Sequence, residues 1–212
     1  MNIIGCVRRL LVLGAMIASP AISQQPPVAR IPPVSPDSRD AILEPIFDTI
    51  RSRGGQPSNI HRTLGNAPKI FKPYTDLAFA LRFDSGVPRV YRELIILRAT
   101  HLFHGDYEFG AHSAMAMSCG LSAEQVAAVR TWPERNALFD ERQRAVIAYA
   151  DGMASPTSVD EPTFAALARH FTPQEIVELT ITASYYVNAV LVTRALGVRV
   201  DGGAGQGTYG RC

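Results

Sequence analysis

Apolar residues recur at every third or fourth position along most of this sequence, which is the period of an α-helix that buries one face. No stretch alternates apolar and polar residues over more than a few positions, as a half-buried strand would. No internal repeat is visible, and the length fits one domain with a substantial core. The pattern therefore predicts an all-α fold, a single-domain helical bundle that spans residues 37–200.

Capping and turn residues place the ends of the predicted helices. Thr172 is a typical N-cap, Pro173 suits the first helical position, Glu175 completes a capping box and Gly197 ends the helix. Residues 69–83 form one helix or a pair broken at Pro73. The other predicted helices span residues 38–53, 59–64, 92–102, 106–118, 140–153 and 160–170, with one more opening at Ser122.

The last predicted helix is apolar nearly all round, which is typical of the buried centre of a bundle or of a contact between subunits. Tyr185, Tyr186 and Asn188 are its polar exceptions. They face a pocket or, as buried polar groups more often do, make hydrogen bonds inside the core.

The first residues are typical of an export signal. Arg8 and Arg9 precede a short apolar run, and Ala21 and Ser23 form a small-x-small cleavage site. The run is too short to span a membrane, so we expect a signal peptide over residues 1–23, an exported protein in the periplasm or outside the cell, and no stable membrane anchor after cleavage. Residues 24–36 contain five prolines and are predicted to form an extended linker.

Two cysteines remain after cleavage, which is too few for a disulfide framework. Cys119 ends an apolar helix, where a buried, unreactive thiol is expected. Cys212 is the last residue, so it is expected to be exposed, and whether it pairs with another chain stays open. Residues 201–212 contain five glycines and are predicted to be a disordered tail.

Charge gives little support for a nucleic-acid partner. The formal net charge is +2, and the basic residues are scattered without interleaved aromatic side chains. We therefore expect a small-molecule substrate and no nucleic acid.

Residues 92–120 hold the chemically most informative group of side chains. A helix through residue 102 is followed by a break at Gly105, and Asp106 is the expected N-cap of a second helix. Glu108 and His112 are four residues apart, hence on one helical face, and the break can fold Glu93 back toward them. A carboxylate and an imidazole in one partly buried site suit general acid–base catalysis.

Two other interpretations of this stretch remain. Glu and His four residues apart on a helix are more often a solvated or structural pair. A metal cluster of His101, His104, Glu108 and His112 is not expected, because the histidines lie on both sides of Gly105 and their spacing fits no established zinc site.

Several short motifs resemble those of the carboxymuconolactone decarboxylase and alkylhydroperoxidase D-like family. They are the Arg-Glu-Leu of residues 92–94, the Gly-Asp-Tyr-Glu of residues 105–108, His112, and the Met-Ser-Cys-Gly-Leu-Ser of residues 117–122. The resemblance extends from about residue 57 to residue 201, and it implies the all-α fold of that family.

The sequence departs from the peroxidase branch of this family. There, two cysteines three residues apart reduce peroxide through a thiolate, and a Glu and a His relay protons. Gly105 and Glu108 stand at the matching positions here, whereas Glu93 and His112 match the relay. The resemblance therefore implies the branch without redox cysteines.

The expected function is cofactor-free acid–base catalysis, a decarboxylation or isomerisation of a small lactone or keto acid. Tyr107 is expected to donate a hydrogen bond to a carboxylate or enolate oxygen. The candidate catalytic residues are Glu93, His112 and Glu108, and the candidate substrate-binding residues are Tyr107, His104 and Asp106. No metal or other cofactor is expected. The alternatives are a thiol peroxidase and a non-catalytic binding protein on the same fold. The resemblance to this family also implies a homo-oligomer.

Overall fold

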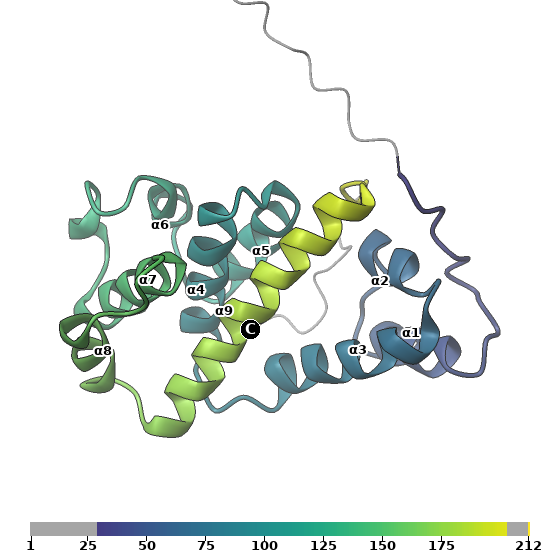
Figure 1. The fold of residues 1–212 in the computed structure, drawn as a ribbon, viewed down its shortest axis with the longest axis horizontal. Coiled ribbons are helices and arrows are strands. Elements are labelled where there is room, and N and C mark those ends of the chain that lie inside the picture. Colours follow the sequence, from purple (N-terminus) through teal and green to yellow (C-terminus); the bar gives the residue numbers. More distant parts are fainter. Residues whose placement is uncertain (1–28, 203–211) are drawn as a thin grey trace, which may run out of the picture.

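The computed structural model describes residues 29–202 and 212, and in this part of the chain the secondary structure is helical throughout, without strands (Figure 1). The all-α class predicted from the sequence is confirmed. The α-helices are α1 (Leu43–Ser52), α2 (Asn59–Leu64), α3 (Pro68–Phe83), α4 (Arg89–Leu102), α5 (Asp106–Ser118), α6 (Ala123–Ala128), α7 (Glu141–Ala154), α8 (Glu161–Ala168) and α9 (Pro173–Leu196).

Most helix ends lie where their capping residues predict. The Ser122 hydroxyl accepts a hydrogen bond from the Gln125 N–H at 3.0 Å, and the Gln125 side-chain oxygen accepts one from the Ser122 N–H at 2.9 Å. The same reciprocal box opens α9 at Thr172, and Gly197 ends α9 in the left-handed region with φ 61°. Both ends of the longest helix are therefore confirmed.

Helix α4 lies at the centre of the main core. It packs against α5, α7 and α9, and its residues 92–100 are all buried. A second group of buried apolar residues joins α1 to α3, with Phe47 and Phe71 among its members. Figure 1 shows α1 to α3 on one side of α9, and α4 to α8 on the other side. The fold thus has two apolar clusters, and α9 lies between them.

Helix α3 continues through Pro73 as one helix, so the break considered at this residue does not occur. Proline removes one backbone hydrogen bond, to the carbonyl of Lys69. Pro73 and Lys69 are both exposed, so water can reach the carbonyl that loses its partner.

Helix α9 is only partly buried. It is 24 residues long with a mean hydropathy of 1.4 in its most apolar window, and 39% of that window is buried. One face packs against α3, α4, α5 and α8. On the other face, the side chains of Val177, Ile181 and Leu191 are 56%, 40% and 53% exposed. Helix α9 thus packs into the bundle with one face and exposes apolar side chains on the other.

The described end of the proline-rich segment lies against the domain. The backbone N–H of Arg30 donates to the Leu196 carbonyl at 3.2 Å, and the N–H of Val34 donates to the Arg62 carbonyl at 3.0 Å. The predicted signal peptide, residues 1–23, lies outside the described residues.

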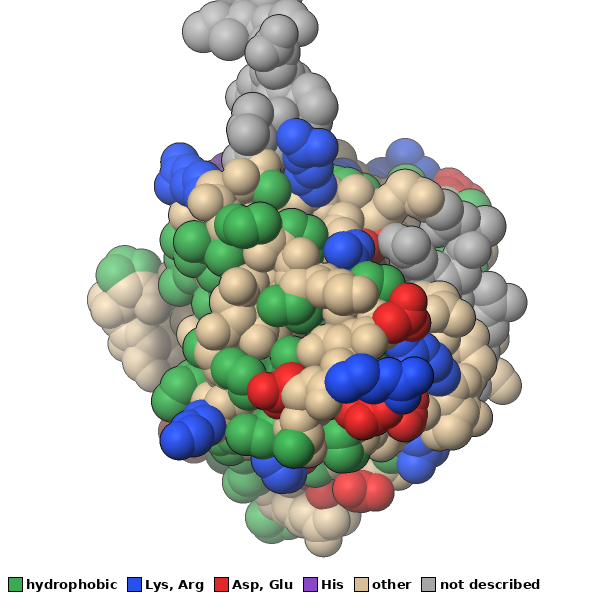
Figure 2. Space-filling view, turned by 90° about the vertical axis from the view of Figure 1, so that its right-hand side faces the viewer, with side chains coloured by type: hydrophobic (Ala, Val, Ile, Leu, Met, Phe, Trp, Pro, Cys, Tyr) green, Lys and Arg blue, Asp and Glu red, His purple; other side chains and the backbone are tan. Residues whose placement is uncertain are grey.

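On the side of the molecule seen in Figure 2, acidic and basic side chains are interspersed with apolar ones, in line with the small net charge.

A disulfide joins Cys119 to Cys212, with the two Cα atoms 5.0 Å apart. The expectation that Cys119 is a buried free thiol is therefore wrong: it is partly exposed at the C-cap of α5, where the end of the chain can reach it. The tail was also predicted to be disordered from residue 201. Instead, Asp201 is held by side-chain contacts, and residues 203–211 lie outside the described part.

Candidate active site

Gly105 sets the close approach of α5 to α9. Helix α5 begins at Asp106, and Gly105 rather than Asp106 is its N-cap. A Cβ atom at position 105 would lie 2.2 Å from Val190 Cγ2 and 3.1 Å from the Thr100 carbonyl. Only glycine fits here without moving its neighbours, so the absence of a side chain brings the first turn of α5 against α9.

The break between α4 and α5 brings Glu93 and His112 together. Glu93 Oε2 lies 2.6 Å from His112 Nδ1, and Glu93 Oε1 lies 2.6 Å from Arg89 Nε. The side chains of Glu93 and His112 are only 1% and 4% exposed. The proximity expected for these two residues is therefore present, and Arg89 completes a buried Arg–Glu–His array.

The charges of this array define the state of the imidazole. Burial opposes ionisation of Glu93, but the hydrogen bond from His112 and the positive charge and hydrogen bond of Arg89 outweigh it and lower the pKa of Glu93. Burial lowers the pKa of His112, against the opposing effect of Glu93. Because a carboxylate only accepts hydrogen bonds, the shared proton is on Nδ1 and the lone pair of the neutral ring is on Nε2.

Glu108, in contrast to the ionised Glu93, is a carboxyl group that stays neutral. It is 5% exposed, and its Oε1 atom has no hydrogen-bond partner. Burial raises the pKa of Glu108 from its ordinary value near 4.5 to about 8, with Arg82 opposing the shift and Asp201 adding to it. At neutral pH this side chain is thus a carboxylic acid with a proton to give.

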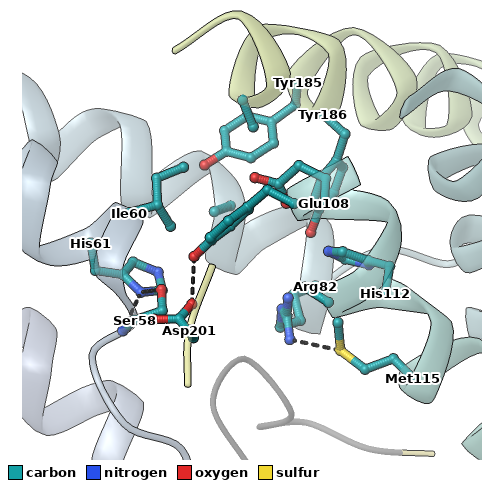
Figure 3. A pocket seen from close by; sticks show the side chains of 14 residues that line it. Ser58, Ile60, His61, Arg82, Glu108, His112, Met115, Tyr185, Tyr186 and Asp201 are labelled. Atoms are coloured by element: carbon teal, nitrogen blue, oxygen red, sulfur yellow. Dashed lines mark hydrogen bonds between the residues drawn. The ribbon is translucent and has the colours of Figure 1, made fainter. Parts of the chain in front are cut away.

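Glu108 and His112 line one cavity of about 70 Å³ between α2, α3, α5 and α9 (Figure 3). This space is large enough for a few water molecules or a small ligand. Polar groups converge on it from all four helices and from the segment after α9. The lining residues are Ser58, Ile60, His61, Ala78, Arg82, Tyr107, Glu108, Ala111, His112, Met115, Tyr185, Tyr186, Ala189 and Asp201.

Aromatic side chains of α9 form one wall. The rings of Tyr186 and His112 meet edge to face with centroids 4.5 Å apart, and Tyr185 stacks near Tyr74 at 4.7 Å. Of the two alternatives for Tyr185 and Tyr186, the structure therefore shows them at the pocket. The contact of Tyr186 with His112 restricts rotation of the imidazole ring.

Arg82 and the Ser58–His61 pair were not predicted as site residues. Arg82 reaches the cavity from α3, and its Nη1 lies 3.5 Å from Met115 Sδ. Ser58 Oγ lies 2.6 Å from His61 Nδ1 at the start of α2, within a local capping box. Burial, with a contribution from Arg82, lowers the pKa of His61 to about 3, so this ring is neutral.

The structure does not bring two of the predicted substrate-binding residues to the cavity. His104 is exposed in the turn before α5, with φ 57°, and the Asp106 side chain is 91% exposed and 4.0 Å from Arg130. Asp106 precedes Glu108 by two residues, or about 200° around the helix, so it faces away. Tyr107 does line the cavity, and its hydroxyl donates to Asp201 Oδ2 at 2.5 Å.

Within residues 29–202, His101, His104 and His112 do not converge with acidic side chains on a metal site. Among the described residues, no group of three or more His, Cys, Asp or Glu side chains is arranged to hold an ion. Within that part of the chain, the site contains acid–base groups, the guanidinium groups of Arg82 and Arg89, and aromatic side chains.

The helical fold and its buried Glu–His–Glu site together define a small all-α protein with acid–base groups at a cavity. Residues 68–152 match the model of the carboxymuconolactone decarboxylase family. This match agrees with the resemblance to the carboxymuconolactone decarboxylase/AhpD-like family that the sequence motifs indicated. Glu93, Glu108 and His112 all lie within the matched segment. No curated protein matches the chain.

Solved structures with the same fold share little sequence with this chain. One is the alkylhydroperoxidase AhpD core of an uncharacterized peroxidase-related protein from Ralstonia eutropha JMP134, with 21% identity, a TM-score of 0.74, and coverage of 88% of this chain and 98% of that one. A peroxidase-related protein from Silicibacter sp. TM1040 has 16% identity, a TM-score of 0.72 and coverage of 89% and 100%. The debrominase Bmp8 in complex with 2,3,4-tribromopyrrole has 20% identity, a TM-score of 0.68 and coverage of 81% and 91%. These likenesses show the shared fold.

Proposed function

We propose that this protein is an exported enzyme that catalyses cofactor-free acid–base chemistry, a decarboxylation or isomerisation of a small lactone or keto acid. The observation that supports this most directly is the pairing of a neutral carboxylic acid, Glu108, with a neutral imidazole, His112, at one cavity. Their pKa values are shifted in opposite directions, the carboxyl up and the imidazole down. A carboxyl group and an imidazole whose pKa values are shifted in this way suit the roles of acid and base.

In the proposed reaction, His112 Nε2 is the general base. Glu93 accepts a hydrogen bond from Nδ1–H at an N–O distance of 2.6 Å. This bond holds the ring in this tautomer and stabilises the imidazolium that forms. For an isomerisation, Nε2 removes a proton from the carbon next to a carbonyl group and later returns it to another carbon. Arg89 keeps Glu93 ionised throughout.

Glu108 is the proposed general acid. In an isomerisation, its proton goes to the enolate oxygen and returns to Glu108 when the carbonyl group re-forms and His112 delivers its proton to the new carbon. In a decarboxylation, the C–C bond to the carboxylate breaks, carbon dioxide leaves, the Glu108 proton goes to the carbanion carbon, and a proton from water restores the acid. In both reactions the transient Glu108 carboxylate is close to Arg82. The positive guanidinium group stabilises the negative charge that develops in either reaction. Tyr107, Tyr185 and Tyr186 line the cavity, and a partly apolar lining strengthens these interactions.

Two observations support export. The N-terminal sequence resembles a cleavable signal, and the chain contains a disulfide between Cys119 and Cys212. Disulfides persist in oxidising compartments and are rare in the cytoplasm.

The structure adds an argument against the thiol peroxidase alternative. Restoring the cysteine pair would require side chains at positions 105 and 108, and a Cβ at position 105 overlaps Val190. The disulfide of this chain lies at the other end of α5, at Cys119. Peroxide chemistry at the usual positions is therefore not supported.

The proposal is tested by measuring carbon dioxide release from a panel of lactones and β-keto acids, together with deuterium uptake from heavy water as a sign of isomerisation. We expect turnover in the mature protein and its loss in His112→Ala and Glu93→Gln, with circular dichroism showing that both variants fold. His170→Ala is the matched control, because His170 lies outside the cavity, 3.7 Å from Glu141. Full activity in both site variants would refute the assignment.

A peroxide assay driven by a dithiol separates the alternatives. Dithiol-dependent peroxide consumption, with no carbon dioxide release or deuterium uptake, would replace the proposal by a peroxidase. Silence in all three assays, with saturable binding of a small acid, would favour the non-catalytic binding protein.

A further inference from the structure

The segment that follows α9 returns to the cavity and places a carboxylate in its wall. Gly197 turns the chain, Val198 is buried, and the Arg199 carbonyl accepts a hydrogen bond from Asn59 Nδ2 at 3.1 Å. Asp201 Oδ1 then accepts from the backbone N–H of Asn59 at 2.7 Å. Asn59 at the start of α2 thus holds the segment at Arg199 and at Asp201.

The second oxygen of Asp201 holds the hydroxyl proton of Tyr107, at an O–O distance of 2.5 Å (Figure 3). A carboxylate has no proton to donate, so in this pair Tyr107 is the donor. With its proton used in this bond, the phenol oxygen can offer only lone pairs to a ligand in the cavity. Ser58 and Glu108 are the other polar groups that act on this hydroxyl.

We propose that Asp201 is a positioning residue that determines specificity: by holding the Tyr107 proton, it makes Tyr107 accept a hydrogen bond from the ligand. The substrate class is therefore a small carbonyl or lactone compound that also bears a hydroxyl group, placed to donate to Tyr107. This differs from the sequence-based expectation that Tyr107 donates to a carboxylate or enolate. The inference rests on the proposed function for the carbonyl or lactone group, and the contacts of Tyr107 and Asp201 add the hydroxyl group.

Asp201→Asn is the informative variant because it keeps the size of the side chain. The Asn59 N–H requires an acceptor, which the amide oxygen supplies. The amide nitrogen then faces the Tyr107 oxygen as a donor, and the phenol turns its own proton toward the cavity. The substitution thus converts Tyr107 from an acceptor into a donor without emptying space.

Binding of a matched pair of probes reads out this reversal. Cyclopentanol and cyclopentanone have nearly the same size, and only the alcohol can donate a hydrogen bond. Since one such bond contributes about 0.5–1.5 kcal/mol, we expect the wild type to prefer the alcohol by roughly 2- to 10-fold, and Asp201→Asn to prefer the ketone. Tyr107→Phe is expected to bind the two equally. The same preference in wild type and Asp201→Asn, or binding of neither probe to the wild type, would overturn the inference.

A second readout needs no ligand and no turnover, so it separates this inference from the proposed function. Burial and the neighbouring Asp201 both raise the pKa of Tyr107. In proton NMR, with the signal assigned through Tyr107→Phe, the Tyr107 hydroxyl proton is expected far downfield in the wild type, because it lies in a short hydrogen bond to a carboxylate, and upfield of that position in Asp201→Asn. The same chemical shift in both proteins would show that Asp201 does not hold this proton.

Discussion

Glu108 and His112 lie one turn apart on α5, and burial shifts the pKa of each toward its neutral form. In water at neutral pH the carboxyl group would be ionised and the imidazole mostly neutral. At this cavity both are uncharged, so a proton donor and a proton acceptor face one space without forming an ion pair. This relationship is the basis of the proposed chemistry and of the first prediction.

Glu108→Gln is expected to stabilise the protein, and more so as the pH rises. Between about pH 4.5 and pH 8 the unfolded chain loses the Glu108 proton while the folded protein retains it. The unfolded state then binds fewer protons, so the stability of the wild type falls with increasing pH through this window, by roughly a few kcal/mol at its upper end. Glutamine cannot ionise and removes this loss.

Thermal unfolding of wild type and Glu108→Gln at pH 4.5, 6, 7 and 8 measures the difference. We expect similar midpoints at pH 4.5 and a growing advantage of the variant toward pH 8. A difference that does not depend on pH would show that Glu108 ionises as easily in the folded protein as in the unfolded one.

Gly105→Ala is expected to destabilise the protein by about 1–3 kcal/mol, because overpacking forces the neighbouring side chains to move. The added Cβ would lie 2.2 Å from Val190 Cγ2. Gly110→Ala is the matched control on the same helix, since a Cβ there meets nothing within 4 Å. The control should gain about 0.5–1 kcal/mol from helix propensity. Equal effects of the two substitutions in urea unfolding would contradict the close packing of α5 on α9.

Reduction of the disulfide is expected to lower stability by about 2–5 kcal/mol, because Cys119 and Cys212 close a long loop in the unfolded chain. They are 93 residues apart in the sequence. Unfolding with and without reductant measures this loss, and the double variant Cys119→Ser/Cys212→Ser should not respond to reductant. Two reactive thiols, or a covalent dimer, in the purified mature protein under oxidising conditions would contradict the pairing.

The outer face of α9 is expected to be a contact between subunits. Val177, Ile181 and Leu191 expose apolar side chains there, at 56%, 40% and 53%. We expect a homo-oligomer at micromolar concentration in light scattering, and dissociation by Ile181→Glu combined with Leu191→Glu. Ile70→Glu is the control, because Ile70 is 74% exposed on α3. A monomeric wild type would contradict this prediction.

The features that the sequence predicts well are local. Thr172 and Glu175, or Ser122 and Gln125, are three residues apart, so the capping bonds between them depend little on the rest of the fold. The pairing of Glu93 with His112 was also within reach, because the break at Gly105 joins two adjacent helices. Spacing along one helix and across one turn is enough for such predictions.

The missed features depend on contacts between distant parts of the chain. Asp201 meets Tyr107 across 94 residues, and no local pattern marks a residue in a glycine-rich tail as part of a site. The disulfide joins residues 93 apart for the same reason. His104 and Asp106 were predicted to bind substrate and are close to Glu108 in the sequence. The start of α5 nevertheless turns them away from the cavity.

The most direct test of the account is the protonation state of Glu108, observed by carbon-13 NMR of the protein labelled at glutamate side-chain carboxyl groups. We expect one carboxyl signal, absent in Glu108→Gln, that remains protonated at pH 7 and titrates near pH 8. That result would establish a buried acid beside the His112 base. If every glutamate carboxyl group of the folded protein were ionised by pH 6, Glu108 would have no proton to give, and the proposed acid–base mechanism would be wrong.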